Sequence, residues 1–177
     1  MFESLPPGPR DKFPDEIFVV VEVPRGTSNK YEYDTEIGVI ILNRALHTST
    51  IYPGDYGFIP KTMAEDGDPI DVLIITHTPT FPYCVVPSIP IGVLKQVDEN
   101  GADHKVIAVP SREPRFASIR EITDLNENIL KEIKHFFMHY KDLEEGKWVR
   151  ILGWGNSIEA KKLIIDAHRK YLEANKS

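Results

Sequence analysis

Cysteine is nearly absent from this chain of 177 residues. Cys84 is the only one, so no intrachain disulfide can form, which suits a reducing compartment. No apolar run approaches the roughly 20 residues of a membrane span, and the first residues lack the basic and then apolar pattern of a secretory signal.

Basic charge is also scarce, because 21 Lys and Arg face 27 Asp and Glu, a formal net charge of −6. Since nucleic-acid binding usually needs a basic face, we expect a soluble, cytoplasmic protein with no nucleic-acid or membrane partner.

Internal repeats, low-complexity tracts and linkers are missing as well. A chain of 177 residues with 41% hydrophobic content is long enough to bury one sizeable core. We therefore expect residues 1–177 to form a single domain.

Strand patterns fill the first two thirds of the sequence, and helical patterns fill the last third. Six segments rich in β-branched or alternating residues predict strands: 17–23, 30–34, 38–42, 70–76, 91–97 and 104–109. The proline-rich stretch 79–90 is expected to be an ordered surface loop. Later segments predict a helix over 129–140, a strand over 147–154, and a last helix that starts at a capping-box pattern, Asn156 to Glu159, and ends near residue 174. The pattern is typical of a mainly β, α+β fold, a small twisted β-barrel with two peripheral C-terminal helices.

One acidic run, DGDPID from Asp66 to Asp71, places three carboxylates within six positions. Such charges repel one another and raise each other's pKa, whereas hard divalent cations favour crowded oxygen ligands. The apolar stretch 72–75 that follows would anchor the run to a core strand. On its own the run fits a magnesium site and an acidic surface turn equally well.

Further acidic residues stand where strands meet. Asp98 and Asp103 flank a predicted hairpin, where facing like charges would be destabilising unless they share a cation; two exposed loop carboxylates are the alternative. Glu22 ends an apolar strand, an unusual place for an unpaired charge, or it is simply a solvated strand end. Glu32 and Lys30 share one strand face.

Other known motifs do not fit. The acidic run lacks the glutamate that closes an EF-hand loop, and His135 and His139 have zincin-like spacing without the required glutamate. No Walker loop or complete dinucleotide-binding glycine pattern is present.

Three segments taken together identify a family. The acidic run, YPGDYG at 52–57 and FFMHYKDLE at 136–144 closely resemble the soluble family I inorganic pyrophosphatases in their short bacterial form. The likeness runs from about residue 15 to the C-terminal helix. It implies a five-stranded OB-like barrel, a hydrolase that uses several Mg²⁺ ions per subunit, and a homohexamer.

The resemblance also implies the roles of individual residues. The implied metal ligands are carboxylates: Asp66, Asp71, Asp98, Asp103, Glu32 and Glu22. Asp68 resembles the general base beside a metal-bridged water. The implied phosphate-binding residues are cationic or phenolic: Lys30, Arg44, Tyr56, Lys105, Tyr140 and Lys141. Tyr52 matches a tyrosine of the same pocket. Two neighbours depart from the family's usual residues, Asn43 in place of an acid and Asp55 in place of an asparagine, and we expect them to tune activity.

The resemblance thus implies hydrolysis of pyrophosphate to two phosphates by a metal-activated water, without a covalent intermediate. Two alternatives remain open: a non-catalytic OB-type module that binds oligonucleotides, and a phosphatase of wider scope. As a hypothesis on assembly, His135 and His139, one helical turn apart, lie at a subunit contact that protonation weakens.

Overall fold

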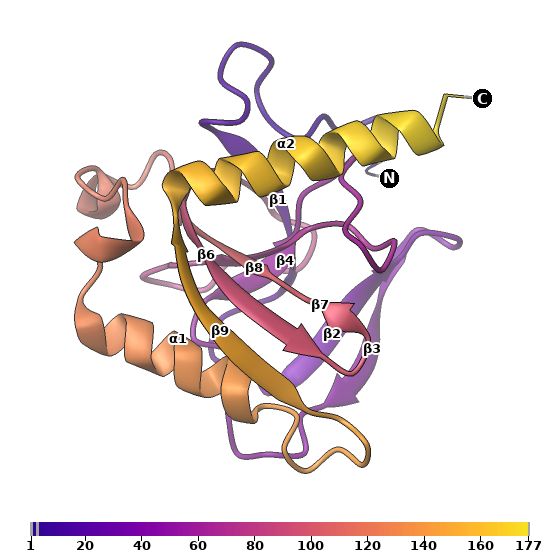
Figure 1. The fold of residues 1–177 in the computed structure, drawn as a ribbon, viewed down its shortest axis with the longest axis vertical. Helices are drawn as coiled ribbons and strands as arrows, with labels where there is room; N and C mark the ends of the chain where they lie inside the picture. Colours follow the sequence, from indigo (N-terminus) through magenta and orange to yellow (C-terminus); the bar gives the residue numbers. More distant parts are fainter. Residues whose placement is uncertain (1, 3, 177) are drawn as a thin grey trace.

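A closed ring of five strands forms the centre of the computed structural model, which describes residue 2 and residues 4–176. In ring order the strands are β1 (Ile17–Val23), β4 (Asp55–Phe58), β5 (Asp71–Ile74), β8 (Lys105–Pro110) and β6 (Val85–Asp98), which pairs back with β1 (Figure 1). The β5–β8 pair is parallel, and the other four pairs are antiparallel. The predicted α+β class, with a five-stranded OB-like barrel and two C-terminal helices, is confirmed.

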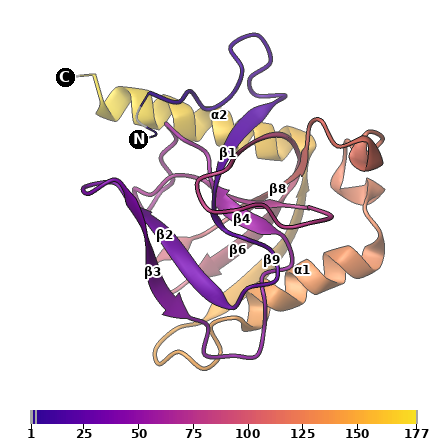
Figure 2. The same cartoon turned by 180° about the vertical axis from the view of Figure 1, so that it is seen from behind.

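Smaller elements extend this ring. Two further strands pair with β6: β7 (Gly101–Ala102) and β9 (Val149–Asn156). A separate antiparallel hairpin stands beside the ring, built from β2 (Asn29–Asp34) and β3 (Val39–Ala45) (Figure 2). Four helices complete the chain: the 3₁₀ helices η1 (Pro114–Phe116) and η2 (Ile122–Asp124), then α1 (Glu127–His139) and α2 (Ser157–Ala174).

All six strands expected in the first two thirds are present. The 3₁₀ helices η1 and η2 were not predicted, and two features of the sheet differ from the sequence-based prediction. The short strand β4 was not predicted, because its turn-rich sequence contains Gly57. A Cβ at Gly57 would lie 1.9 Å from the backbone oxygen of Val20, so only glycine lets β1 and β4 pair this closely. The surface loop expected over 79–90 is wrong from Val85 onward, where β6 begins. Its Pro90 stands beside a break in the pairing with β8, a place where a strand tolerates proline.

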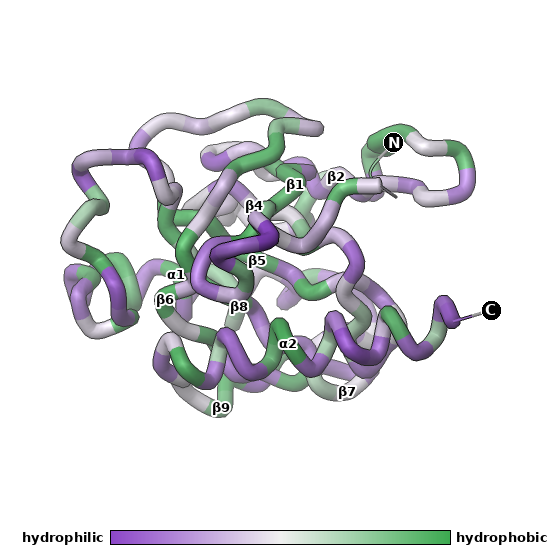
Figure 3. The backbone as a smooth tube through the Cα atoms, turned by 90° about the horizontal axis from the view of Figure 1, so that it is seen from above, coloured by the Kyte–Doolittle hydropathy of each residue, from purple (hydrophilic) through white to green (hydrophobic). Residues whose placement is uncertain are grey.

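The ring is apolar on both faces, which explains its uninterrupted hydrophobic segments. Alternate residues of β5 enter different hydrophobic clusters: Leu73 belongs to the cluster that contains Phe136 of α1, whereas Val72 belongs to the cluster that contains Ile164 of α2. Each helix therefore buries one side against the barrel, and in Figure 3 the α2 tube alternates between apolar and polar colours. The predicted capping box at the start of α2 is confirmed, because Asn156 and Glu159 exchange side-chain-to-backbone hydrogen bonds. Within the described residues, no helix has the length and apolarity needed to cross a membrane.

Candidate active site

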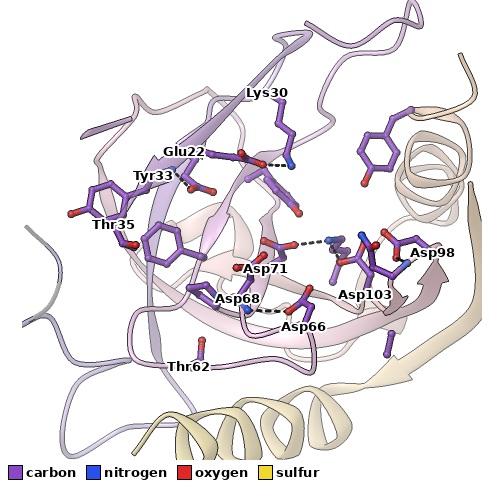
Figure 4. A pocket seen from close by; sticks show the side chains of 18 of the residues that line it. Glu22, Lys30, Tyr33, Thr35, Thr62, Asp66, Asp68, Asp71, Asp98 and Asp103 are labelled. Atoms are coloured by element: carbon purple, nitrogen blue, oxygen red, sulfur yellow. Dashed lines mark hydrogen bonds and ion pairs between the residues drawn. The ribbon is translucent and has the colours of Figure 1, made fainter. Parts of the chain in front are cut away.

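One cavity of about 710 Å³ collects nearly all the predicted site residues. They reach it from β1, the β2–β3 hairpin, β4, the acidic run, the β6–β8 region and the end of α1. Thirteen of them line it: Glu22, Lys30, Glu32, Arg44, Tyr56, Asp66, Asp68, Asp71, Asp98, Asp103, Lys105, Tyr140 and Lys141. In Figure 4, the acidic run lies between Glu22 and Lys30 on one side and Asp98 and Asp103 on the other.

Tyr52 is the exception among the predicted residues. Its side chain is 1% exposed and packs against Tyr56 and Phe136, with ring centroids 5.4 and 4.8 Å away. It therefore supports the cavity wall from behind and is not among the residues that line the cavity, which differs from the predicted pocket position.

The acidic run is both a turn and part of the site. Gly67 has φ +93°, a conformation that favours glycine, and Asp68 N donates to Asp66 Oδ1 over 3.0 Å. Asp71 then begins the core strand β5, as the apolar residues after it predicted. The two interpretations that the run alone left open are therefore compatible, since its three carboxylates all line the cavity.

A buried lysine separates two of the carboxylates. Lys105 has a side chain that is 3% exposed, and its Nζ lies 2.5 Å from Asp71 Oδ2 and also contacts Asp103 Oδ1. Burial alone would lower the pKa of Lys105, but Asp71 and Asp103 outweigh burial and raise it above its ordinary value. Burial raises the pKa of Asp103, and repulsion from Asp71 raises it further. Lys105 lowers this pKa, but its single ammonium is shared between two carboxylates, and the pKa of Asp103 stays above its ordinary value. This part of the cavity thus carries an excess of negative charge that a further cation would offset.

Glu22 lies at the inner wall of the same cavity. The residue is 9% exposed, and its Oε1 accepts a hydrogen bond from Tyr33 N over 2.7 Å. The alternative of a solvated strand end is therefore wrong. Burial raises the pKa of Glu22 to about 8, with a smaller contribution from Asp71.

This burial makes folding stability depend on pH in the metal-free protein. Below about pH 4.5, Glu22 is protonated in both the folded and the unfolded chain; between about 4.5 and 8 the folded chain keeps the proton and the unfolded chain loses it. Stability should therefore fall as the pH rises through this window, by at most about 5 kcal/mol. Glu22→Gln, which can still accept from Tyr33 N, should remove this part of the slope. Urea unfolding in EDTA from pH 5 to 8 measures both proteins, and parallel curves would contradict the prediction.

A chain of polar contacts links the β2–β3 hairpin to the loop after α1. Lys30 Nζ lies 2.5 Å from Glu32 Oε1, and the amide of Asn43 donates to Glu32 Oε2 over 2.6 Å. Asn43 Oδ1 accepts from Arg44 Nη1 over 2.8 Å, and Arg44 Nε donates to Glu144 over 2.9 Å. The amide of Asn43 thus donates to Glu32 and accepts from Arg44. An acid is common at this position in the family that the sequence resembles. Glu144 was not predicted, because it lies 100 residues from Arg44 and carries no local signal.

On the opposite side of the cavity, Asp98 ends β6 and pairs with Lys141. The two side chains meet at 2.8 Å, and Asp98 is only 7% exposed, so the alternative of an exposed loop aspartate is wrong. Burial tends to raise the pKa of Asp98, but Lys141 and the backbone N–H of Asn100 lower it below the ordinary value. The predicted hairpin is present, since Asp98 stands opposite Gly101 and Asp103 N bonds back to Gln96 O.

The carboxylates do not form a ready-made metal cluster in this arrangement. Among residues 2 and 4–176, no three His, Cys, Asp or Glu side chains converge closely enough to hold an ion. The donors are nevertheless of the oxygen type that hard divalent cations prefer. Asp103 and Glu22, whose pKa values burial raises, would be stabilised in the charged form by a cation.

Comparison with known proteins shows the family of this chain. The family model described as inorganic pyrophosphatase matches residues 19–172. The chain belongs to this family. The soluble family I resemblance seen in the sequence is thereby confirmed, and with it the expected class of enzyme, an inorganic diphosphatase.

Relatives of this pyrophosphatase family extend along almost the whole chain. A protein of Aeropyrum pernix named inorganic pyrophosphatase is 46% identical over 166 residues, 93% of this chain and 94% of its own length. One of Agrobacterium fabrum with the same name is 50% identical over 161 residues, 89% of this chain and 91% of its own. The crystal structure of inorganic pyrophosphatase from Thermus thermophilus superposes with a TM-score of 0.93 at 44% identity, covering 97% of this chain and 98% of the other.

Proposed function

We propose that the chain hydrolyses inorganic pyrophosphate to two phosphates, in a Mg²⁺-dependent reaction in which water attacks directly. The observation that carries this proposal is that one cavity brings carboxylates and cations together. They lie in contact with one another: Lys30 with Glu32, Lys105 with Asp71 and Asp103, and Lys141 with Asp98. Phosphoryl transfer depends mainly on positioning and charge stabilisation, and this mixed lining supplies both.

The carboxylates of the cavity would hold the metal ions. We assign Asp66, Asp71 and Asp103 to a first ion, with Asp71 also reaching a second. We assign Asp98 with Asp103 to an ion that accompanies the substrate, and Glu32 and Glu22 to the remaining acidic positions. Divalent ions bound there supply a water of lowered pKa and offset the charge of pyrophosphate.

Asp68 is proposed to take the proton from the attacking water. Partial burial, with repulsion from Asp66 and Asp71, raises the pKa of Asp68 above its ordinary value. A carboxylate whose pKa moves toward neutrality accepts a proton more readily. No hydrogen bond of its side chain to another described residue competes for this role.

Cations and phenols are proposed to bind the phosphate oxygens. Lys30, Arg44, Lys105 and Lys141 bring positive charge, and Tyr56 and Tyr140 bring hydroxyl donors. Burial raises the pKa of both phenols, so that they remain protonated donors. These groups can hold the leaving phosphate while its charge develops.

Direct attack by water is part of the proposal. Positioning and charge stabilisation account for most of the catalysis of phosphoryl transfer, and the carboxylates and cations of the cavity lining supply both. We therefore assign no side chain as a covalent nucleophile and no phosphoryl-enzyme step.

Phosphate release from pyrophosphate, with Mg²⁺ and with EDTA, tests the proposal. We expect release only in Mg²⁺, and little release from nucleotides or polyphosphate, which separates this enzyme from a phosphatase of wider scope. Absence of release in Mg²⁺, together with oligonucleotide binding that weakens in salt, would support the alternative of a binding module.

We further propose a cytoplasmic homohexamer in which each chain forms one domain over residues 1–177. Met138 and Leu143, near the end of α1, are exposed apolar side chains at 38% and 67%, and the rings of His135 and His139 lie 4.6 Å apart beside them. At neutral pH we expect a sedimentation mass of six 20.1 kDa chains. Protonation would add positive charge to both histidines, and Asp142, whose Oδ2 lies 2.6 Å from His139 Nδ1, would offset only one of these charges. The mass should therefore fall in mild acid; an unchanged profile would contradict the histidine contact.

A further inference from the structure

A buried amide stands behind Asp103. Gln96 lies in β6 and is 0% exposed. Its Nε2 donates to Asp103 Oδ2 over 3.1 Å, while Asp103 Oδ1 contacts the ammonium of Lys105. The two carboxylate oxygens are thus divided between a group in the protein interior and a cation that lines the cavity.

The backbone fixes the same two residues opposite each other. Asp103 N donates to Gln96 O over 3.0 Å. On either side the register pairs Leu94 with Lys105 and Val97 with Ala102. The Gln96 amide therefore reaches Asp103 from a strand that is anchored in the barrel.

The carboxylate of Asp103 determines which way the Gln96 amide points, and this orientation leaves the amide oxygen without a hydrogen-bond partner. An ionised carboxylate only accepts hydrogen bonds, so the NH₂ end must face Asp103. The other end, Oε1, is buried without a hydrogen-bond partner among the described residues. Since a buried acceptor without a partner is unfavourable, an apolar side chain of similar length would serve the core better. The contact with Asp103 is what the amide adds.

We propose that Gln96 is a positioning residue for metal binding. It holds Asp103 Oδ2 from behind and so directs Oδ1, which also contacts Lys105, toward an ion in the cavity. The inference rests on the proposed function, which assigns a divalent ion to Asp103. Groups that hydrogen-bond to metal ligands orient them, and their loss typically weakens metal binding about 10- to 100-fold.

Binding of Mn²⁺ alone, without pyrophosphate, tests this role. Gln96→Met keeps the length of the side chain and removes the donor to Asp103. We expect the dissociation constant for Mn²⁺ to rise about 10- to 100-fold, as measured by calorimetry or by the electron paramagnetic resonance signal of free Mn²⁺. Two effects on the stability of the metal-free protein oppose each other, because the unpaired Oε1 is removed while Asp103 Oδ2 loses its donor. The unfolding temperature therefore serves to show that the variant is folded, and the Mn²⁺ affinity carries the test. Lys95→Met is the matched control on the same strand: Lys95 Nζ contacts Glu159 at 2.8 Å, and its loss should leave Mn²⁺ binding unchanged.

Equal Mn²⁺ affinity in a folded Gln96→Met and the parent would overturn the inference. If Gln96→Met does not fold, Gln96→Asn, which withdraws the amide by one methylene, should show the same weakened binding. Weakening of equal size in an Asp103→Ala background would also overturn it, because Gln96 would then act without Asp103. A parent that binds no Mn²⁺ would remove the proposed metal site together with this inference, whereas a parent that binds with unchanged Gln96 variants removes the inference alone.

Discussion

Replacing Asp68 by asparagine should lower the rate of phosphate release from pyrophosphate by about 10²- to 10⁴-fold, the usual contribution of a general base. Asparagine has nearly the same shape but cannot take a proton from water. Asp68 is exposed in the acidic turn, so the substitution should change folding stability by no more than about 0.5 kcal/mol. Initial rates in saturating Mg²⁺, with urea unfolding of both proteins, measure the two effects separately.

Glu65→Gln is the matched control for this experiment. Glu65 is exposed in the same segment and carries the same charge, but we assign it no part in the reaction. Its replacement should leave the rate unchanged. Normal activity in Asp68→Asn would remove Asp68 as the base, and an equal loss in both variants would show that the rate follows the local charge of the turn.

Replacing Lys105 by methionine should destabilise the metal-free protein at pH 7 by about 3 kcal/mol and abolish most activity. The change leaves two carboxylates, on Asp71 and Asp103, without their shared cation, and breaking a buried ion pair on one side typically costs about 3–5 kcal/mol. We expect the lower end, because the side chain of Asp71 is 29% exposed. Mg²⁺ should then raise the unfolding temperature of the variant more than that of the parent, since a bound cation replaces the missing charge.

Lys95→Met again supplies the control. Lys95 and Glu159 form an ion pair with side chains that are 36% and 47% exposed, and such pairs contribute about 0–1 kcal/mol. A loss of stability in Lys105→Met no larger than in Lys95→Met would show that the buried ion pair is not the source of stability. An equal response of parent and variant to Mg²⁺ would contradict the placement of a cation beside Asp71 and Asp103.

Local sequence patterns predicted most helices and strands, because β-branched runs and capping residues act through neighbours that are close in the sequence. The β-branched runs predicted β1 and β5, and the capping pattern at Asn156 located the start of α2 to the residue. The failures have physical causes. Strand β4 contains a glycine that only the approach of β1 requires, and β6 continues through Pro90, beside which its pairing with β8 is broken.

The candidate site could be predicted only in part from local patterns. The acidic run by itself did not distinguish a turn from a metal site, and the family resemblance supplied its partners. Two contacts escaped both approaches. Glu144 reaches Arg44 across 100 positions. Gln96 is only seven positions from Asp103, but the contact depends on which side chains the hairpin turns toward each other. A glutamate or a glutamine at these positions does not indicate a site in the sequence, because its partner becomes apparent only in the folded structure.

The order of the elements along the chain has a consequence for synthesis. All five strands of the closed ring precede residue 111, so the ring can close while the last third of the chain is still being made. The cavity, however, also takes Tyr140 and Lys141 from the end of α1. A nascent chain would therefore gain its barrel before the last two of its proposed phosphate-binding residues, and we expect hydrolysis to begin only after the end of α1 had left the ribosome.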